Sequence, residues 1–231
     1  MPSYSSVQSS PIVLDSSTEA QVYGLFALAM GLTVVGVFVG MMFAPVILTS
    51  GWHFLFLIVE LAIIFSARWW MEKSPLNYLL FALFPLLTGI TIAPFLVIVS
   101  TQYANGNAII VNALASTGFM AAAAAVFAKT TSWNLGVMGR GLFFALLGLL
   151  VLGILQLFFP SLRTSQFELL LSGAGVVIFA LFTAFDVQRI TVLSRQGTNA
   201  FLLALSLYLD IFNLFLYVLR FMLALSGNRR S

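Results

Sequence analysis

The chain consists largely of apolar stretches of about 20 residues, the length that an α-helix needs to cross a bilayer, separated by turn-forming or charged segments. Two of these separators are "RWWMEKSP" at 68–75 and "KTTSWN" at 129–134. The second apolar stretch is interrupted by Gly51 and His53. The pattern predicts an all-α, polytopic membrane protein, a bundle of seven transmembrane helices at 22–43, 47–67, 77–99, 108–128, 141–159, 167–187 and 201–225.

Composition supports this prediction. Of the 231 residues, 61% are hydrophobic and 7% are charged, and the mean hydropathy is +1.08. A soluble domain carries about 25% charged residues, so this chain lacks the polar groups to cover a water-facing surface. The net charge of +3 is too small and too dispersed to indicate nucleic-acid binding. Cysteine is absent, which excludes disulfides and thiolate metal sites.

The first 20 residues differ from the rest of the chain. They are rich in serine, contain neither lysine nor arginine, and have no apolar core of their own, so they do not resemble a signal peptide. We expect a disordered or surface-lying tail at 1–20, followed by a single transmembrane domain at 21–231.

Basic residues predict the orientation, because lysine and arginine are enriched in cytoplasmic loops. The segments after the second, fourth and sixth spans hold most of them, whereas the opposite side holds Arg163 and the terminal Arg229 and Arg230. This bias favours a cytoplasmic N-terminus and an external C-terminus. We expect a bacterial plasma membrane, with an organelle membrane as the alternative. The residues on the cytoplasmic side are Arg68, Lys73, Lys129, Arg140, Arg189 and Arg195.

Three acidic residues fall within or at the edge of predicted spans: Glu60, Asp186 and Asp210. A charge at the centre of a spanning helix costs roughly 2.5–3.5 kcal/mol on insertion scales, so each needs a partner inside the bundle. The remaining acidic residues lie in the tail or at span ends, where solvent accounts for them. These are Asp15, Glu19, Glu72 and Glu168.

Glu60 lies in the middle of "FLIVELAIIF", and Arg220 is the only basic residue deep in a predicted span. We therefore expect a buried Glu60–Arg220 ion pair. Two interpretations remain open: the pair fixes how the seventh helix docks, or it takes a direct part in gating.

Asp186 and Asp210 stand on either side of the loop that joins the last two spans. A hairpin brings them toward the same third of the membrane, although spacing alone permits their contact without requiring it. Asp210 shares a polar stripe at helical spacing with Ser206, Asn213 and Tyr217, and Thr183 lies one turn before Asp186. The alternative for Asp186 is a solvated acid at a helix end that pairs with Arg189.

Two carboxylates that meet in a low dielectric do not easily both ionise, so such a pair holds one proton near neutral pH. Its oxygens also suit a hard cation such as Ca²⁺, which takes six to eight oxygen ligands. Two aspartates and a few hydroxyls fall short of that number. This small number of oxygen ligands therefore predicts a weak, transient Ca²⁺ site at Asp186 and Asp210. Such a site fits an ion-conducting pathway better than a protein that stores Ca²⁺.

Four segments together resemble the Bax inhibitor, or transmembrane Bax inhibitor motif, family. "ALSLYLDIFNLFLYVLRF" at 204–221 is similar to the family's C-terminal signature, and "FTAFDVQRI" at 182–190 to its aspartate-bearing sixth helix. "IVELAIIFSARWW" at 58–70 resembles its second helix, and "LLTGITIAPF" at 86–95 its kinked third helix. The resemblance covers nearly the whole chain after residue 20.

The resemblance implies a seven-helix bundle around a central C-terminal helix, and a pH-sensitive Ca²⁺ leak channel. It assigns the roles of proton sensor and cation site to Asp186 and Asp210, and of core latch to Glu60 with Arg220. Some relatives carry a basic cluster directly after the second helix that engages the aspartates. Here that segment reads "ARWWMEKS", so the resemblance leaves the basic latch unassigned.

Three functions remain open at this stage. The first is a passive Ca²⁺ pathway gated by protonation of the aspartate pair. The second is a membrane-embedded regulator that binds a protease or stress-response partner through its tail and basic loops. The third is proton-coupled cation exchange. An enzyme and a bound cofactor are not expected, because His53 is the only histidine and no phosphate-binding or metal-binding motif is present.

Overall fold

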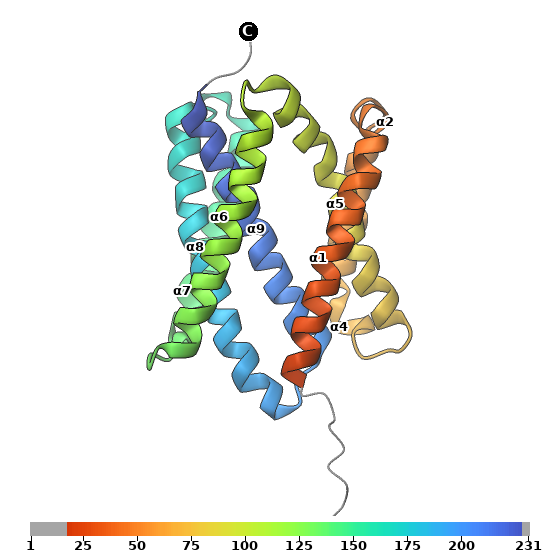
Figure 1. Cartoon of the computed structure of the whole chain (residues 1–231), viewed down its shortest axis with the longest axis vertical. Helices are drawn as coiled ribbons and strands as arrows, with labels where there is room; N and C mark the ends of the chain where they lie inside the picture. Colours follow the sequence, from red (N-terminus) through yellow and green to blue (C-terminus); the bar gives the residue numbers. More distant parts are fainter. Residues whose placement is uncertain (1–17, 228–231) are drawn as a thin grey trace, which may run out of the picture.

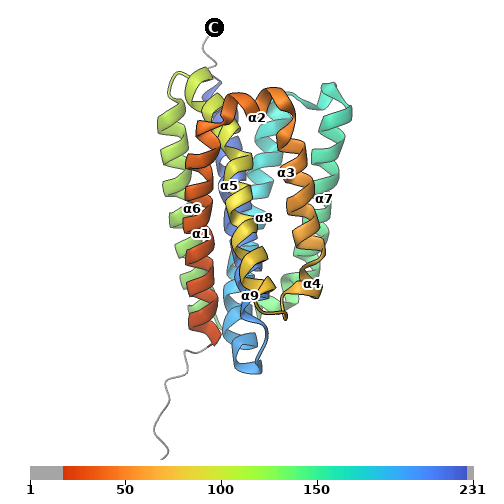
Figure 2. The ribbon, with the colours of Figure 1, turned by 90° about the vertical axis from the view of Figure 1, so that its right-hand side faces the viewer.

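The computed structural model describes residues 18–227, and within this range the chain is helical with no strand. The predicted all-α, polytopic membrane fold is confirmed: among the described residues, six helices are long and apolar enough to cross a membrane, and a bent helix pair makes a seventh (Figures 1 and 2). The helices are α1 (Thr18–Met42), α2 (Ala44–Ser50), α3 (Trp52–Phe65), α4 (Ala67–Trp70), α5 (Leu76–Gln102), α6 (Gly106–Thr130), α7 (Gly139–Phe158), α8 (Ser165–Leu193) and α9 (Ala200–Ser226).

The second predicted span, 47–67, is not one continuous helix. Gly51 adopts a left-handed conformation with φ of 74°, and α2 and α3 meet there at an angle of 89°. Figure 2 shows α2 lying across one end of the bundle while α3 descends along its side. With 14 residues, α3 is about 21 Å long at 1.5 Å per residue. Glycine accepts this conformation at little cost, which explains the break at this position.

Other helices extend beyond their predicted bounds. The sixth span was expected to end at 187, whereas α8 continues to Leu193 and is followed by a 3-10 turn at Ser194–Gln196. Helix α5 remains one helix through Pro85 and Pro94. The expected tail at 1–20 lies outside the described residues except for 18–20, which form the first turn of α1.

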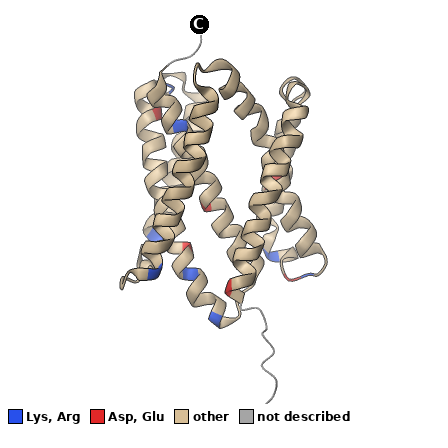
Figure 3. Ribbon diagram, viewed as in Figure 1, with Lys and Arg blue, Asp and Glu red and all other residues tan. Residues whose placement is uncertain are grey.

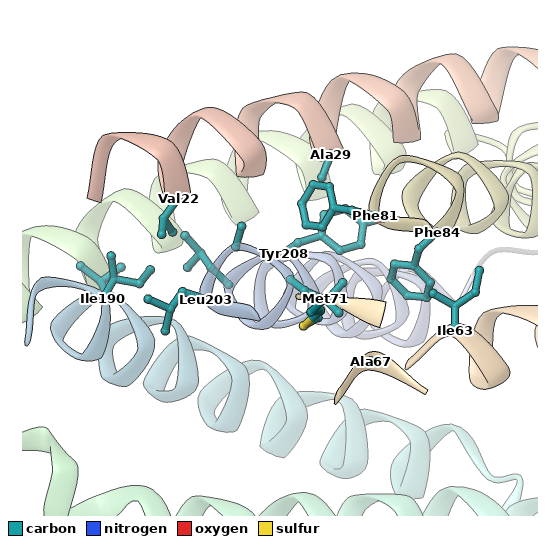
Figure 4. Packing of buried hydrophobic residues seen from close by; sticks show 14 of the residues in the cluster. Val22, Ala29, Ile63, Ala67, Met71, Phe81, Phe84, Ile190, Leu203 and Tyr208 are labelled. Carbon is teal, nitrogen blue, oxygen red and sulfur yellow. The ribbon is translucent and has the colours of Figure 1, made fainter. Parts of the chain in front are cut away.

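Helix α9 occupies the centre of the bundle. Figure 1 shows it crossing between a group formed by α1 and α5 and a group formed by α6, α7 and α8. It packs against α8, α1, α6 and α5, and its residues belong to both buried clusters of the protein. In Figure 4, its Tyr208 lies beside Phe81 and Phe84 of α5 and close to Ala29 of α1. The C-terminal helix is thus central, as the resemblance implied.

Helices α1 and α5 approach each other closely because glycines face each other at their contact. A Cβ atom on Gly36 would collide with the backbone carbonyl of Leu86, and one on Gly89 with the carbonyl of Thr33. Small residues allow such backbone contact between helices in a membrane, where dispersion rather than the hydrophobic effect drives packing. Glycine is therefore required at this crossing.

We predict that Gly36→Val destabilises the bundle, because the added side chain must separate α1 from α5. Overpacking of this kind costs about 1–3 kcal/mol, which corresponds to a Tm lower by several degrees in a thermal unfolding measurement on the detergent-solubilised protein. Gly31→Val is the matched control on the same helix, because a Cβ there meets no atom within 4 Å. Equal Tm values for the two variants would contradict the close contact of α1 with α5.

Candidate functional site

The hairpin between α8 and α9 places two acidic side chains against each other inside the bundle. The chain turns at Gly197, whose φ is 73°, and the Asn199 side chain accepts a hydrogen bond from the Phe201 backbone N–H at the start of α9. Asp186 lies seven residues before the end of α8 and Asp210 ten residues after the start of α9. At 1.5 Å per residue these positions are about 10 and 15 Å from the turn, so the antiparallel helices bring them level.

The two carboxyl groups lie next to each other, and the Ser206 side chain lies beside Asp186. Both residues are buried, with exposed fractions of 3% for Asp186 and 8% for Asp210. The expectation that Asp186 ends its helix was wrong, because α8 continues for seven more residues. Asp186 is therefore an interior group and not a solvated one.

Among residues 18–227, one basic side chain approaches the pair. Arg189 Nη1 lies 3.6 Å from Asp186 Oδ1, so the expected pairing of these two residues is present although the solvated helix end is not. The Arg189 side chain is 37% exposed, which weakens its field through solvent screening. Lys73, which follows the second span, instead lies over the Trp69 ring at 3.8 Å from the ring centroid.

The charges at this site do not balance when both carboxyls are ionised, because two buried negative charges face one half-exposed arginine. In that state the Oδ2 atoms of Asp186 and Asp210 are buried without a hydrogen-bond partner among the described groups. A single proton held by the pair lets one carboxyl donate to the other. Chemically, the arrangement suits either a shared proton or a cation held by carboxylate and hydroxyl oxygens.

The other predicted supporting residues, on the stripe and one turn before Asp186, lie near the site without binding the carboxylates. The Thr183 hydroxyl donates to the Phe179 carbonyl at 2.8 Å, and the Asn213 amide donates to the Leu209 carbonyl at 2.7 Å. Tyr217 stacks on Phe179 with ring centroids 5.4 Å apart. Of the four predicted supporting residues, Ser206 is the one that the structure joins to the aspartates.

The predicted Glu60–Arg220 ion pair is wrong. Arg220 binds Glu168 in a bidentate manner, with Nε 2.6 Å from Oε1 and Nη2 3.0 Å from Oε2, and Nη2 lies 3.4 Å from Gln156 Oε1. Glu168 is near the start of α8 and Arg220 near the end of α9, so the antiparallel hairpin places both at the same end of the bundle. Glu168 was expected at a span end with its charge stabilised by solvent alone, and this expectation is wrong as well.

Glu60 has neutral partners instead. It accepts hydrogen bonds from Thr91 Oγ1 at 2.6 Å and from Thr88 Oγ1 at 3.4 Å, both on α5. The residue is 8% exposed. Helix α3 packs along α5, and this neighbour supplies the hydroxyl groups that satisfy the carboxylate. These threonines carry no charge and belong to another helix, so nothing in the sequence marks them as partners of Glu60.

A cavity of about 800 Å³ opens at the end of the bundle where α9 ends. The Glu168–Arg220 pair and Gln156 form part of its lining, together with Arg163, Tyr103 and Leu223. Arg163 donates to the carbonyl groups of Gln156 and Leu157 at the end of α7. The cavity therefore combines charged and apolar walls, and α5, α7, α8 and α9 all contribute to it.

Comparison with known proteins gives a consistent result. The model of the family described as "Inhibitor of apoptosis-promoting Bax1" matches residues 16–228. An uncharacterised protein of Campylobacter jejuni is 33% identical over 201 residues, which are 86% of this chain and 84% of the relative. One of Borreliella burgdorferi is 29% identical over 236 residues, 95% of each chain. "Inner membrane protein YbhL" of Escherichia coli (strain K12) is 29% identical over 181 residues, 74% of this chain and 72% of the relative.

Double-mutant cycles distinguish the two pairings of Arg220. Glu168→Gln and Arg220→Met each leave one charge unpaired, so the double variant should lose less stability than the sum of the single changes. We expect a coupling free energy of about 0.5–3 kcal/mol, in the lower half of that range because both side chains are about a third exposed. The measurement is reversible unfolding of the solubilised protein.

The matched cycle combines Glu60→Gln with Arg220→Met. These residues share no hydrogen-bond partner among the described groups, so their effects should add within about 0.5 kcal/mol. Coupling in this second cycle and additivity in the first would reinstate the Glu60–Arg220 pair.

Proposed function

The chain belongs to the Bax inhibitor family, and we propose that this multi-pass integral membrane protein is a passive cation pathway, best suited to Ca²⁺, that is gated by protonation of Asp186 and Asp210. The observation that carries the proposal is the meeting of two buried carboxyl groups, one from each of the last two helices. The names of these relatives state no transport activity, so the proposal depends on the geometry.

Protonation supplies the gating free energy. With one proton, the two carboxyl groups share a hydrogen bond that ties α8 to α9. Without it, two negative charges repel each other across a low-dielectric contact, where electrostatic interactions are several times stronger than in water. Arg189 offsets part of this repulsion from Asp186 alone. Loss of the proton therefore favours either separation of the helices or uptake of a cation between the carboxylates.

The oxygen ligands at the aspartate pair determine which class of cation the site can bind. Carboxylate oxygens and the Ser206 hydroxyl are hard ligands, and hard divalent cations such as Ca²⁺ prefer oxygen. Fewer protein oxygens meet here than the six to eight that Ca²⁺ takes, so a bound ion retains water and leaves readily. Weak binding of this kind is what conduction requires, since an ion must leave each site as easily as it arrives.

We further infer that the end of the bundle where α1 begins faces the cytoplasm of a bacterial inner membrane. Figure 3 shows most lysine and arginine residues gathered toward this end, which fits the enrichment of basic residues in cytoplasmic loops. One relative bears the name of an inner membrane protein, which supports the choice of membrane.

The orientation is testable by cysteine labelling, since the chain has no native cysteine. Lys73→Cys lies at the end where α1 begins and Ser165→Cys at the opposite end, and both positions are exposed. With a membrane-impermeant thiol reagent we expect Ser165→Cys to react in intact cells with a permeabilised outer membrane. Lys73→Cys should react in inverted vesicles alone. The reverse labelling pattern would contradict the proposed orientation.

Ca²⁺ flux into proteoliposomes that contain an encapsulated indicator tests the gating. We expect the flux through the unaltered protein to change between about pH 5 and about pH 8, a range in which buried carboxyl pairs exchange protons. Asp210→Asn removes one titrating group and one of the two cation-binding carboxylates. In this variant the flux should no longer respond to pH. Glu72→Gln, which changes an exposed acid in a loop, is the matched control and should behave as the unaltered protein.

The same vesicles distinguish a leak from an exchanger. A passive pathway follows the Ca²⁺ gradient, so an imposed proton gradient at constant internal pH should leave its net direction unchanged, whereas proton-coupled exchange reverses with that gradient. Flux and pH response that survive Asp210→Asn unaltered would show that the aspartate pair is not the gate.

A further inference from the structure

The contact between α8 and α9 continues well beyond the aspartates. On α9, Asp210 is followed at helical spacing by Asn213, Tyr217 and Arg220, which lie on one face of the helix. From the aspartate pair, this section of the contact runs to the Arg220–Glu168 ion pair, which faces the cavity of about 800 Å³. It therefore has polar groups at both ends, and Tyr217 lies between them.

Tyr217 fills this middle section. Its ring stacks on Phe179 at an interplanar angle of 24° and lies directly over Gly175, where an added Cβ atom would collide with the ring. Helix α8 thus has no side chain at the position where the ring enters. Phe221, one turn further along α9, packs less closely on Gly173, where an added Cβ atom would lie 3.3 Å from its ring. These aromatic rings, and not polar groups, close the space between the two helices.

The ring is also held from the cavity side. The Arg220 guanidinium carbon lies 5.5 Å from the centroid of the Tyr217 ring, within the range of a cation–π interaction. The same guanidinium is fixed by its two bonds to Glu168. A rotation of Tyr217 away from Gly175 therefore disturbs Arg220, and any movement of Arg220 that frees Glu168 removes one of the supports of the ring.

We infer that the cavity is the second mouth of the cation route, and that Tyr217 closes the passage between this mouth and the Asp186–Asp210 pair. The inference rests on the proposed function, since it names where the cation route leads and what blocks it. The cavity has room for on the order of twenty water molecules at about 30 Å³ each, which is enough for a hydrated cation. A packed aromatic constriction excludes water and ions until it moves.

The mouth also contains a ligand for the cation. Glu168 is 29% exposed and its carboxylate is neutralised by Arg220 in this state. Once the arginine moves aside, the carboxylate is left at the inner wall of the cavity, where it attracts a cation toward the passage. In the closed state described here, the ion pair and the ring block the route together.

The test measures whether a thiol reagent reaches the aspartate pair, and not the flux of Ca²⁺. Thr183 lies on α8 between Phe179 and Asp186 and is 1% exposed, so in the cysteine-free chain Thr183→Cys reports whether a reagent reaches the aspartate side of Tyr217. A cationic, membrane-impermeant methanethiosulfonate is applied to intact and to inverted membranes. Ser165→Cys, which lines the cavity, identifies the preparation in which the cavity is open to the reagent.

In that preparation we expect Thr183→Cys to react slowly, and to react at least tenfold faster when Tyr217→Ala is added. Tyr217→Phe retains the ring and should remain slow. Phe212→Ala is the matched control, because Phe212 stacks on Tyr208, away from the Asp210 face of α9, and its loss should not open the passage. If Tyr217→Ala does not fold, Tyr217→Val replaces it with the same expectation.

The outcomes separate this inference from the proposed function. Faster labelling in Tyr217→Ala supports the closure even if no Ca²⁺ flux is found, in which case the proposed function fails alone. If pH-dependent flux is present but labelling of Thr183→Cys is equally slow in Tyr217→Ala and in Phe212→Ala, Tyr217 is not the closure. Labelling that accelerates in both variants reflects general loosening of the bundle and also overturns the inference.

Discussion

The free-energy cost of burying a carboxylate inside a membrane-spanning bundle explains much of how these helices are placed. A buried charge is tolerated when hydrogen bonds, an opposite charge or a proton compensate for lost water, and three local solutions occur here. Thr88 and Thr91 donate hydrogen bonds to Glu60 across the α3–α5 contact. Arg220 forms an ion pair with Glu168 across the α8–α9 contact. Asp210 lies against the carboxyl group of Asp186. The third solution differs in kind, because two acids compensate each other only while one holds a proton. That makes it the one chemically responsive contact of the three.

The α8–α9 hairpin links this contact to the far end of the bundle. Its antiparallel register sets Asp186 against Asp210, Phe179 against Tyr217, and Glu168 against Arg220. A change of helix separation at one pair is carried along two stiff helices to the others, because helices in a packed bundle move as units more readily than they bend. In the proposed function, the hairpin itself therefore couples proton exchange near one surface to opening of the cavity at the other, without an additional connecting element.

Much of this architecture could be read from the residues, and the failures share a physical cause. Apolar length predicted the spans, and the segment at 204–221 indicated a family that the match over residues 16–228 confirms. Helical periodicity, however, states which residues share a face without stating which neighbour that face meets. Glu60 was therefore assigned to Arg220, when the neighbouring helix offered threonines and the hairpin offered Glu168. The break at Gly51 was visible as an irregularity, but its 89° bend depends on packing that composition does not encode.

Helix α9 is held from two sides at its centre, and this limits how it responds to the proton. Two residues before Asp210, the Tyr208 hydroxyl lies 2.7 Å from Thr33 Oγ1 on α1, and the Tyr208 ring packs edge-on against Phe84 on α5 with ring centroids 5.9 Å apart. Tyr208 is fully buried, so breaking its hydrogen bond with Thr33 leaves two polar groups without water, at about 1–3 kcal/mol for each unsatisfied group. Repulsion between two carboxylates about 4 Å apart is about 4 kcal/mol at an effective dielectric constant of about 20, which is of the same order as that cost. Under the proposed gating, the Tyr208 contacts and the repulsion of the aspartates act on opposite faces of one helix, which favours a rotation or tilt of α9 about Tyr208 over its departure from α1 and α5.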